Sequence, residues 1–418
     1  MGALRRGPLV IVERAATAGG ARRTTRRDHL DTYGYNRLGV SRVINASAMM
    51  TRLGGALLAS AVTDAMVEAS RAHVDLDEVK SRAGEAIAGW TGAEAAWVTS
   101  GAAAGLALMT AAVVAGADPA RVARLPNADW EPRSILLQAG HWVDFGAPVE
   151  QMIRLGGGRP VPVGAVNHVS GEALRAAMVS PVAAAVLFVQ SHHAVQAGMR
   201  TLGEVIALAR ERALPVLVDA AAEEDLGRYV AVGADLVAYS GGKAFEGPTS
   251  GFIAGRAVLV AACRAQERGI GRVMKVGKEE TLGLLAALDG YVRRDHAAER
   301  ARQAAIVADL VQRLQDLPHT RVGELRDEAG REILRVAVSP DTKRLGVSAS
   351  ELVRALADGT PRVMVRAHRA AEGTIALDPR PLSPDDVGHL AEAIRAAYRR
   401  LRRSDPTSGD RTQPDGPR

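Results

Sequence analysis

The chain has 418 residues, a hydrophobic content of 47% and a formal net charge of +6, which is enough length for one large and one smaller domain. Its one cysteine, Cys263, excludes an internal disulfide, and no apolar run approaches the ~20 residues that span a bilayer. Because the first residues also lack the apolar core of a signal peptide, we expect a soluble, cytoplasmic protein.

The positive charge lies at the two ends of the chain. Residues 1–28 hold seven arginines against two acidic residues, and residues 399–418 hold six arginines against three. The body between them is slightly acidic, which argues against a nucleic-acid partner. We expect a disordered N-terminal arm over residues 1–32 and a disordered tail over residues 404–418.

Strands and helices are expected to alternate over residues 33–280. The segment VINASAMMTRLGG fits neither pattern and is expected to be a loop that lines a cleft. Helices are expected at residues 60–90 and 106–114, and from the capping box at Thr201 to about residue 213. Strands are expected at residues 95–99, 134–138, 182–189, 215–218 and 236–239, with an antiparallel strand at 251–254. Since these strands are apolar throughout, they should form a mostly parallel sheet covered on both faces.

The pattern changes after Lys278. A long helical stretch over residues 282–317 is expected to connect two domains and to end at Pro318. Residues 281–403, including this helix, then indicate a smaller α+β domain. Its expected elements are strands near 332–338 and 362–366, a capped helix over 348–356, and a final helix that begins at Ser383-Pro384.

Polar side chains follow the ends of five expected strands: Ser100, His141, Ser191, Asp219 and Ser240. In mostly parallel sheets, ligands bind beyond the carboxyl ends of the strands. These five positions therefore predict one binding site at one edge of the sheet.

Lys243 follows the last of these strands in a turn of small residues, Ser240-Gly241-Gly242. Glycines let the backbone approach a ligand closely, and a lysine held at a fixed point can form an imine with an aldehyde. Taken alone, a lysine in such a turn is far more often a solvated surface residue than a reactive amine. The chain has only five lysines, however, which narrows the search for a reactive amine.

Three further positions complement this lysine. Asp219 suits the position opposite a pyridinium nitrogen, and Ser100-Gly101-Ala102 at a strand-to-helix junction suits a phosphate. His141 could stack on an aromatic ring. Taken singly, each has an ordinary explanation as a strand cap, a common turn or a loop histidine. No P-loop, HExxH motif or cysteine cluster is present, so we expect no metal site.

The order of these residues resembles the fold-type-I pyridoxal-phosphate (PLP) enzymes. The segments VINASAMMTRLGG, SHHAVQAGM, VDAAAEED, SGGKAFEGP and GIGRVMKVGKEE narrow the resemblance to the selenocysteine-synthase-like group, and further to its D-glucosaminate-6-phosphate ammonia-lyase branch. The resemblance implies an aspartate-aminotransferase-like α/β fold with a mostly parallel seven-stranded sheet, in a PLP-binding domain over residues 33–280. It also implies a homodimer or a higher homo-oligomer.

The resemblance implies a role for each candidate residue. It places PLP on Lys243, with Asp219 at the pyridine nitrogen and His141 over the ring. The phosphate is expected at Ser100, Gly101, Ala102 and Ser240. Residues expected near the ring hydroxyl or the substrate are Ser191, His192 and His193, of which the two histidines are candidate acids for a leaving hydroxyl.

The resemblance also suggests where anions bind. Arg380 matches the position that often holds a substrate carboxylate in this fold, and Arg52 and Thr51 are further candidates for substrate binding. Lys275 and Arg272 could serve the phosphate of a neighbouring subunit.

The predicted reaction is the elimination of water and ammonia from a 2-amino-3-hydroxy acid, such as D-glucosaminate or its 6-phosphate, to give a 2-keto acid. Racemisation, retro-aldol cleavage and β-replacement share its early steps, so the residues leave these alternatives open. A tRNA-acting selenium or sulfur transferase is a third hypothesis, which the slightly acidic body of the chain disfavours.

Overall fold

The computed structural model describes residues 34–403, except residues 36, 192–193, 195–196 and 329. The expected arm over residues 1–32 and the tail over residues 404–418 lie outside the described residues. The chain divides into a short N-terminal unit, Met1–Val43, and a second unit, Ile44–Arg418. The described residues of the first unit form a turn in which the N–H groups of Leu38 and Val40 donate to the carbonyl of Tyr35.

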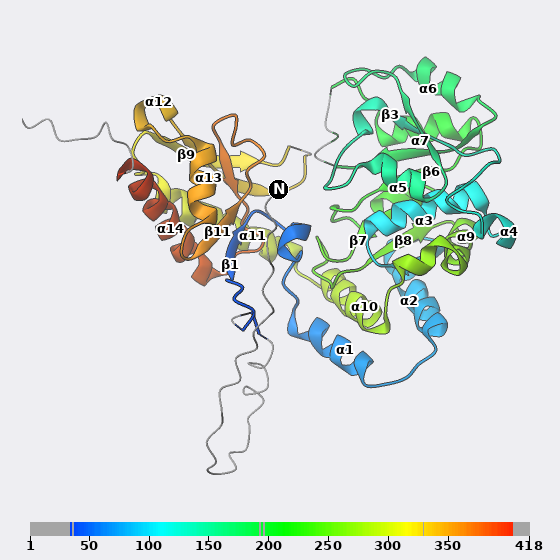
Figure 1. Cartoon of the computed structure of the whole chain (residues 1–418), viewed down its shortest axis with the longest axis horizontal. Helices are drawn as coiled ribbons and strands as arrows, with labels where there is room; N and C mark the ends of the chain where they lie inside the picture. Colours follow the sequence, from blue (N-terminus) through cyan, green and yellow to red (C-terminus); the bar gives the residue numbers. More distant parts are fainter. Residues whose placement is uncertain (1–33, 36, 192–193, 195–196, 329, 404–418) are drawn as a thin grey trace, which may run out of the picture. The chain divides into compact units, whose positions relative to one another are not determined.

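The second unit holds a seven-stranded sheet with the strand order β2-β8-β7-β6-β5-β3-β4. Strands β3, β6, β7 and β8 of this sheet are labelled in Figure 1. The bounds are β2 Ala95–Thr99, β3 Ser134–Gln138, β4 Arg159–Val163, β5 Ala183–Val189, β6 Val216–Asp219, β7 Leu236–Ser240 and β8 Gly251–Gly255. Only β8 runs antiparallel to its neighbours, as expected. The predicted fold class is therefore confirmed.

Helices cover both faces of this sheet. One face packs against α2 (Leu76–Thr91), α6 (Gly171–Met178), α7 (Leu202–Arg210), α8 (Arg228–Val232) and α10 (Lys278–Val292). The other face packs against α3 (Ala102–Ala115), α5 (Val149–Leu155) and α9 (Ala257–Ala265). Because both faces are buried, the central strands consist mostly of apolar residues rather than alternating apolar and polar ones.

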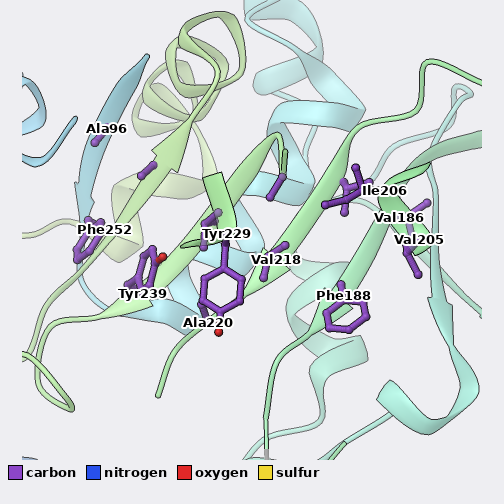
Figure 2. Packing of buried hydrophobic residues seen from close by; sticks show 14 of the residues in the cluster. Ala96, Val186, Phe188, Val205, Ile206, Val218, Ala220, Tyr229, Tyr239 and Phe252 are labelled. Atoms are coloured by element: carbon purple, nitrogen blue, oxygen red, sulfur yellow. The ribbon is translucent and has the colours of Figure 1, made fainter. Parts of the chain in front are cut away.

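The side chains of the central strands divide between the two faces with a period of two. Figure 2 shows one face, where Val186, Phe188, Val218, Tyr239 and Phe252 project from four strands. The residues between them belong to the core on the other face. A buried valine, leucine or phenylalanine contributes roughly 1.5–3 kcal/mol, so this double core is what holds the strand ends in register.

The strand β4 was not predicted from the sequence, RPVPV. Proline cannot donate to a neighbouring strand and is therefore confined to edge strands. The structure places β4 at the edge of the sheet, where it pairs only with β3. Proline therefore occurs at positions where no further strand needs its N–H group.

The single helix expected over residues 60–90 is two helices, α1 (Ser60–Ser70) and α2. The carboxylate of Asp75 accepts hydrogen bonds from the N–H groups of Asp77 and Glu78, so it starts α2 as an N-cap. The helix expected over residues 282–317 is likewise divided into α10 and α11 (His296–Leu314). There Asp295 caps the second helix through the N–H groups of Ala297 and Ala298.

A three-stranded antiparallel sheet, ordered β12-β10-β9, follows α11. Its bounds are β9 Thr320–Arg326, β10 Leu334–Pro340 and β12 Ile375–Leu377. The other elements of this part are α12 (Thr342–Leu345), α13 (Ala349–Ala357), β11 (Arg362–Val365) and α14 (Pro384–Arg403). Residues of α11, α13, α14 and the strands share one buried core. We call the three strands the small sheet.

The boundary between two domains near residue 280 stays a prediction. It falls inside α10, which packs against α1 and α2. We propose that the boundary lies instead at the break between α10 and α11. No described helix combines the length and the apolar character needed to cross a membrane.

Candidate active site

The register of the large sheet brings the predicted strand-end residues to one edge. Thr99 and Ser240 both pair with Gly251, so the ends of β2 and β7 lie on either side of one residue of β8. On the next strands, Asp219 pairs with Ala238 of β7 and with Val189 of β5. The turns that begin at Ser100, Ser191 and Ser240 therefore leave the same edge of the sheet as Asp219.

The turn at Ser100 is packed closely against the end of β8. A Cβ atom on Gly251 would lie 2.5 Å from the carbonyl oxygen of Tyr239 and 2.8 Å from the carbonyl carbon of Gly101. Only glycine permits this approach. The helix α3 begins directly afterwards at Ala102, and the first N–H groups of a helix have no partner within the helix. Ser100, Gly101 and Ala102 thus offer N–H groups and a hydroxyl to an anion.

Lys243 lies in a turn that is held from two sides. The N–H of Gly241 donates to the carbonyl of Ser250 at 2.8 Å, and the N–H of Ala56 donates to the carbonyl of Gly242 at 3.1 Å. A Cβ atom on Gly55 would lie 2.5 Å from the same Gly242 oxygen, so the segment before Ala56 lies close against the lysine turn. These contacts fix the backbone that carries the amine.

The amine of Lys243 is half-buried, and its pKa is lowered. Burial is the main cause, because it disfavours the charged form. The carboxylate of Asp219 opposes this effect, and the guanidinium of Arg331 adds to it. A lysine with a lowered pKa has a larger unprotonated fraction near neutral pH, which both imine formation and proton abstraction require.

Asp219 is the last residue of β6 and is buried. Burial raises its pKa, while the N–H of Ala221, which donates to Oδ1 at 3.1 Å, and the charge of Lys243 oppose the rise. A buried carboxylate of this kind gains stability from a cationic hydrogen-bond donor placed against it. Asp219 and Lys243 therefore form an electrostatically coupled pair at the predicted site.

His141 ends a short 3₁₀ helix, Ala139–His141, directly after β3. The N–H of Val189 donates to its Nδ1 at 3.2 Å, and its ring meets Phe188 edge-on at 4.6 Å between centroids. Burial lowers its pKa to about 4, so the ring is neutral at physiological pH. Stacking of His141 on a cofactor stays a prediction. His192 and His193 lie outside the described residues, and Ser191 follows β5 as expected.

The residues predicted to bind the substrate differ in their contacts and in their exposure. Arg380 donates through Nε and Nη2 to Asp378 at 2.9 and 3.0 Å, and through Nη1 to Glu224 at 3.3 Å. It therefore already binds two carboxylates. Thr51 and Arg52 are exposed in a 3₁₀ helix, Thr51–Leu53, which lies just before Ala56 in the segment that contacts the Lys243 turn.

Arg331 was not predicted from the sequence. It lies between β9 and β10, yet its Nη1 donates to the carbonyl of Ala222 at 3.2 Å, three residues after Asp219. Its charge lowers the pKa of Lys243. Arg331 is 88 residues from Lys243 in sequence and belongs to no motif. The one signal for it in the sequence was the acidic segment VDAAAEED, whose negative charge favours a basic side chain nearby.

Within the described part of the chain, no group of three or more histidine, cysteine, aspartate or glutamate side chains could hold a metal ion. The site is thus composed of a lysine, a buried carboxylate, a helix N-terminus and nearby arginines. These groups suit an organic cofactor that carries an aldehyde and a phosphate.

Comparisons with known proteins agree with this geometry. The family model described as SelA, L-seryl-tRNA selenium transferase, matches residues 43–354. The chain belongs to this family. Its SelA-like relatives include a 5'-C-glycyluridine monooxygenase-decarboxylase of a Streptomyces species, 45% identical over 361 residues that cover 86% of this chain and 90% of the relative. A D-glucosaminate-6-phosphate ammonia lyase of Salmonella typhimurium is 40% identical over 361 residues, covering 86% and 96%.

A solved structure of D-glucosaminate-6-phosphate ammonia-lyase matches with a TM-score of 0.81 at 38% identity, and covers 88% of this chain and 99% of that one. A serine palmitoyltransferase of Sphingomonas wittichii shares the fold, with a TM-score of 0.54 at 16% identity. The resemblance to the selenocysteine-synthase-like group and to its ammonia-lyase branch is confirmed, and the chain is an enzyme of fold type I.

Proposed function

We propose that this SelA-like chain is a PLP-dependent lyase that eliminates water from a 2-amino-3-hydroxy acid, such as D-glucosaminate or its 6-phosphate. Water then hydrolyses the resulting enamine to a 2-keto acid and ammonia, so the net change is the loss of ammonia. The observation that supports this most directly is the coupled pair of Lys243 and Asp219 at one edge of the sheet. The relationship to an ammonia lyase at 40% identity over most of both chains supports the choice of reaction.

The residues present fit PLP. Lys243 would bind the aldehyde carbon, and the buried carboxylate of Asp219 would accept a hydrogen bond from the protonated ring nitrogen. The turn at Ser100, which Gly251 allows to pack closely against the end of β8, would hold the phosphate at the start of α3 together with Ser240. When bound, PLP would supply an electron sink for the substrate carbon that loses its proton.

The side chains then have separate tasks. The amine of Lys243, with its lowered pKa, would take the proton from the substrate's α-carbon. Asp219 would remain ionised beside the cationic ring nitrogen. His192 and His193 are proposed as acids for the leaving β-hydroxyl. The arginines Arg52 and Arg380, with Thr51, are proposed for the substrate's anionic groups, and Arg380 would exchange Glu224 for the substrate.

A second candidate function is the oxidative decarboxylation of 5'-C-glycyluridine. It is favoured by the 45% identity to the Streptomyces enzyme, over the same length of chain as the ammonia lyase. Both candidates can use Lys243 and Asp219 to hold PLP, and the two reactions differ in the group that leaves the substrate and in the steps that follow. Racemisation, retro-aldol cleavage and β-replacement remain alternatives of the same kind. A tRNA substrate is disfavoured because the two relatives at 45% and 40% identity described above act on other compounds by name.

One experiment separates the two candidates. The full-length protein is supplied with PLP and incubated separately with D-glucosaminate, its 6-phosphate and 5'-C-glycyluridine. Ammonia and a 2-keto acid from either sugar acid support the lyase, whereas carbon dioxide release with oxygen uptake from the nucleoside supports the decarboxylase. Borohydride reduction and peptide mapping report whether the cofactor is attached to Lys243. Attached cofactor without product from either sugar acid would reject the lyase proposal.

We also propose a homo-oligomer with small-molecule substrates, in the cytoplasm. Arg272 and Lys275 are exposed and have no ion-pair partner among the described residues. Between them Val273 is 86% exposed, and an exposed apolar side chain flanked by free cations is suited to contact with a neighbouring subunit. Light scattering of the purified protein measures the mass, and a monomer would count against this proposal.

A further inference from the structure

Residues 241–247, the lysine turn, pack against one face of α10 in their second half. Phe245 is buried and meets the ring of Tyr291 edge-on, at 5.0 Å between centroids. A Cβ atom on Gly247 would lie 3.3 Å from the Cβ atom of Ala287. Ala287 and Tyr291 are four residues apart in α10, so they project from the same face of the helix. This face of α10 therefore supports the part of the turn that follows the lysine.

Arg294 continues this face just past the end of α10 at Val292. Its guanidinium donates through Nη1 to Oε1 of Glu246 at 3.1 Å and through Nη2 to Oε2 at 2.6 Å. The bidentate pairing fixes the plane of the guanidinium against the carboxylate. The side chains of Arg294 and Glu246 are only 28% and 30% exposed, so salt and water screen this pair less than pairs on the open surface.

Glu246 has a backbone conformation that side chains rarely adopt. Its φ is +55°, in the left-handed region, where the Cβ atom of a residue other than glycine is crowded. Such a residue persists only where its surroundings hold it there. Arg294 holds the side chain of Glu246, and the main-chain N–H of Glu246 donates to the carbonyl of Lys243 at 3.1 Å. The strained residue thus connects the arginine directly to the backbone of the lysine.

The same end of α10 also contacts the loop that follows Asp219. The hydroxyl of Tyr291 donates to the carbonyl of Glu224 at 2.5 Å. Directly after Arg294, the side chain of Asp295 caps α11, the helix that leads to the small sheet. The end of α10 thus contacts both the lysine turn and the loop after the buried aspartate, and continues into α11.

We propose that Arg294 is a positioning residue for Lys243: its ion pair with Glu246 holds the lysine turn in the strained conformation that presents the amine to the cofactor. Its part in catalysis rests on the proposed function, in which this amine binds PLP and then takes a proton from the substrate. Without the ion pair, Glu246 is free to leave the left-handed region, and the bond from its N–H to the carbonyl of Lys243 is lost with it. The lysine then populates conformations in which its amine does not reach the aldehyde of PLP.

The first measurement follows the turn itself in the cofactor-free, full-length chain. The N–H of Gly247 donates to the carbonyl of Gly241 at 2.8 Å and closes the turn, so hydrogen exchange at Glu246 and Gly247 reports how often the turn opens. In Arg294→Gln these two amides should exchange about ten-fold faster, which corresponds to about 1.4 kcal/mol. This measurement does not depend on the reaction that the loaded enzyme performs.

Substitutions of Glu246 separate the strained conformation from the ion pair. Glu246→Ala removes the carboxylate and keeps the Cβ atom, so the turn should open as in Arg294→Gln. Glu246→Gly also removes the carboxylate, but glycine adopts the left-handed region without a penalty, so exchange and PLP affinity should stay closer to those of the wild type. A contact that only adds stability would give the opposite order, because glycine is the more flexible residue. His319→Gly, at an exposed residue with a φ of +46° between α11 and β9, is the control and should change neither measurement.

The second measurement shows whether the turn positions the amine. Each variant is titrated with PLP, and borohydride reduction with peptide mapping measures the cofactor fixed on Lys243. Arg294→Gln and Glu246→Ala should need roughly ten-fold more PLP for half-saturation, because fewer chains hold the competent turn. Arg293→Gln is the matched control, since the neighbouring arginine pairs with Asp289 at an exposed position, and it should bind PLP as the wild type does.

Unchanged exchange in the folded Arg294→Gln chain would overturn the proposal. Faster exchange without a loss of PLP affinity would overturn it as well, because the ion pair would then hold the turn without positioning the lysine. If Arg294→Gln does not fold, Glu246→Ala and Glu246→Gly decide, and equal losses in the two would reject the proposal.

The proposed function can fail separately. If the lyase activity is present, kcat at saturating PLP should fall in Arg294→Gln while KM changes little, because Lys243 acts after the substrate has bound. Weaker fixation of PLP in Arg294→Gln, together with no product from the wild type, would reject the proposed function and leave the positioning role of Arg294 intact.

Discussion

The main-chain N–H of Val189 donates a hydrogen bond to Nδ1 of His141 at 3.2 Å. This bond places the proton of the neutral imidazole on Nε2. The ring is further fixed by its edge-on contact with Phe188, and both partners belong to β5. His141 is thus held in one orientation and one tautomer next to β5, the strand that Ser191 follows.

A first prediction concerns the pH dependence of stability. Burial lowers the pKa of His141 from 6.5 to about 4, so between these values the unfolded chain binds a proton that the native chain does not. Above pH 6.5 the protonation of His141 therefore takes nothing from the free energy of unfolding. As the pH falls from 6.5 toward 4, protonation of the unfolded chain lowers that free energy. Since each pKa unit corresponds to about 1.4 kcal/mol, the loss should amount to about 3 kcal/mol.

Urea unfolding at several pH values checks this prediction. His141→Phe should remove the extra loss of unfolding free energy between pH 6.5 and 4 that the wild type shows. His389→Asn, at an exposed position on α14, is the control and should retain it. If the free energy of unfolding changes equally with pH in the wild type and in His141→Phe, the pKa of the imidazole is not lowered in the native chain.

A second prediction concerns the close approach at Gly251. In Gly251→Ala the new methyl group would meet the carbonyl oxygen of Tyr239 at 2.5 Å and the backbone of Gly101 at 2.8 Å. Backbone atoms cannot move away as a flexible side chain can, so we expect a loss of about 1–3 kcal/mol of unfolding free energy. Because the Ser100 turn must shift, PLP affinity should fall as well. Equilibrium dialysis with PLP and thermal unfolding measure the two effects.

The matched control for this variant is Gly290→Ala. Gly290 lies within α10 and a Cβ atom there would meet nothing within 4 Å. Replacing a helical glycine by alanine should stabilise the chain by about 0.5–1 kcal/mol without changing PLP affinity. If both variants bind PLP as the wild type does, the Ser100 turn is not the phosphate site.

The fold could be predicted where burial alone decides the structure. The strand β5 is buried at all seven positions, so its apolar run is an unambiguous signal. The strand β9 was missed because its seven residues, TRVGELR, are partly or fully exposed and carry charges, and only pairing with β10 makes them a strand. Helix breaks were missed where a single side chain, such as Asp295, starts a new helix by capping it.

The site could be predicted in so far as it lies at strand ends. Asp219 and Ser240 were found because each follows an apolar run directly, and sheet topology brings such ends together. Arg331 could not be found in this way, since its approach to Ala222 depends on how the small sheet folds. The contacts of Arg380 could not be predicted from the sequence either, because its partner Asp378 is held by Arg335 from a different strand.

A third prediction concerns the tyrosine that supports the loop after Asp219. Tyr229→Phe removes the hydroxyl that donates to Oε2 of Glu223 at 2.7 Å. Oε1 of Glu223 already has no hydrogen-bond partner among the described residues, so the variant leaves a buried carboxyl group with neither oxygen satisfied. The expected loss of unfolding free energy is about 1–3 kcal/mol.

A double-mutant cycle with Glu223→Leu checks this. Removing both polar groups should cost less than the sum of the two single losses, because the second substitution removes the unsatisfied carboxyl group. Strictly additive losses would indicate that the hydroxyl and the carboxylate do not interact. Tyr398→Phe, which removes a hydroxyl that bonds to Thr320 far along the chain, should be additive with Glu223→Leu.

A fourth prediction concerns Arg335, a fully buried arginine that pairs with both Asp327 and Asp378. Arg335→Met removes a fully buried cation and leaves Asp327 and Asp378 with less compensating charge in the core. Breaking a buried ion pair from one side costs about 3–5 kcal/mol, whereas Arg313→Met, at the half-exposed pair with Asp309, should change stability little. Urea unfolding measures both variants. A stability loss no larger than that of Arg313→Met would mean that the aspartates keep their arginines in place without Arg335.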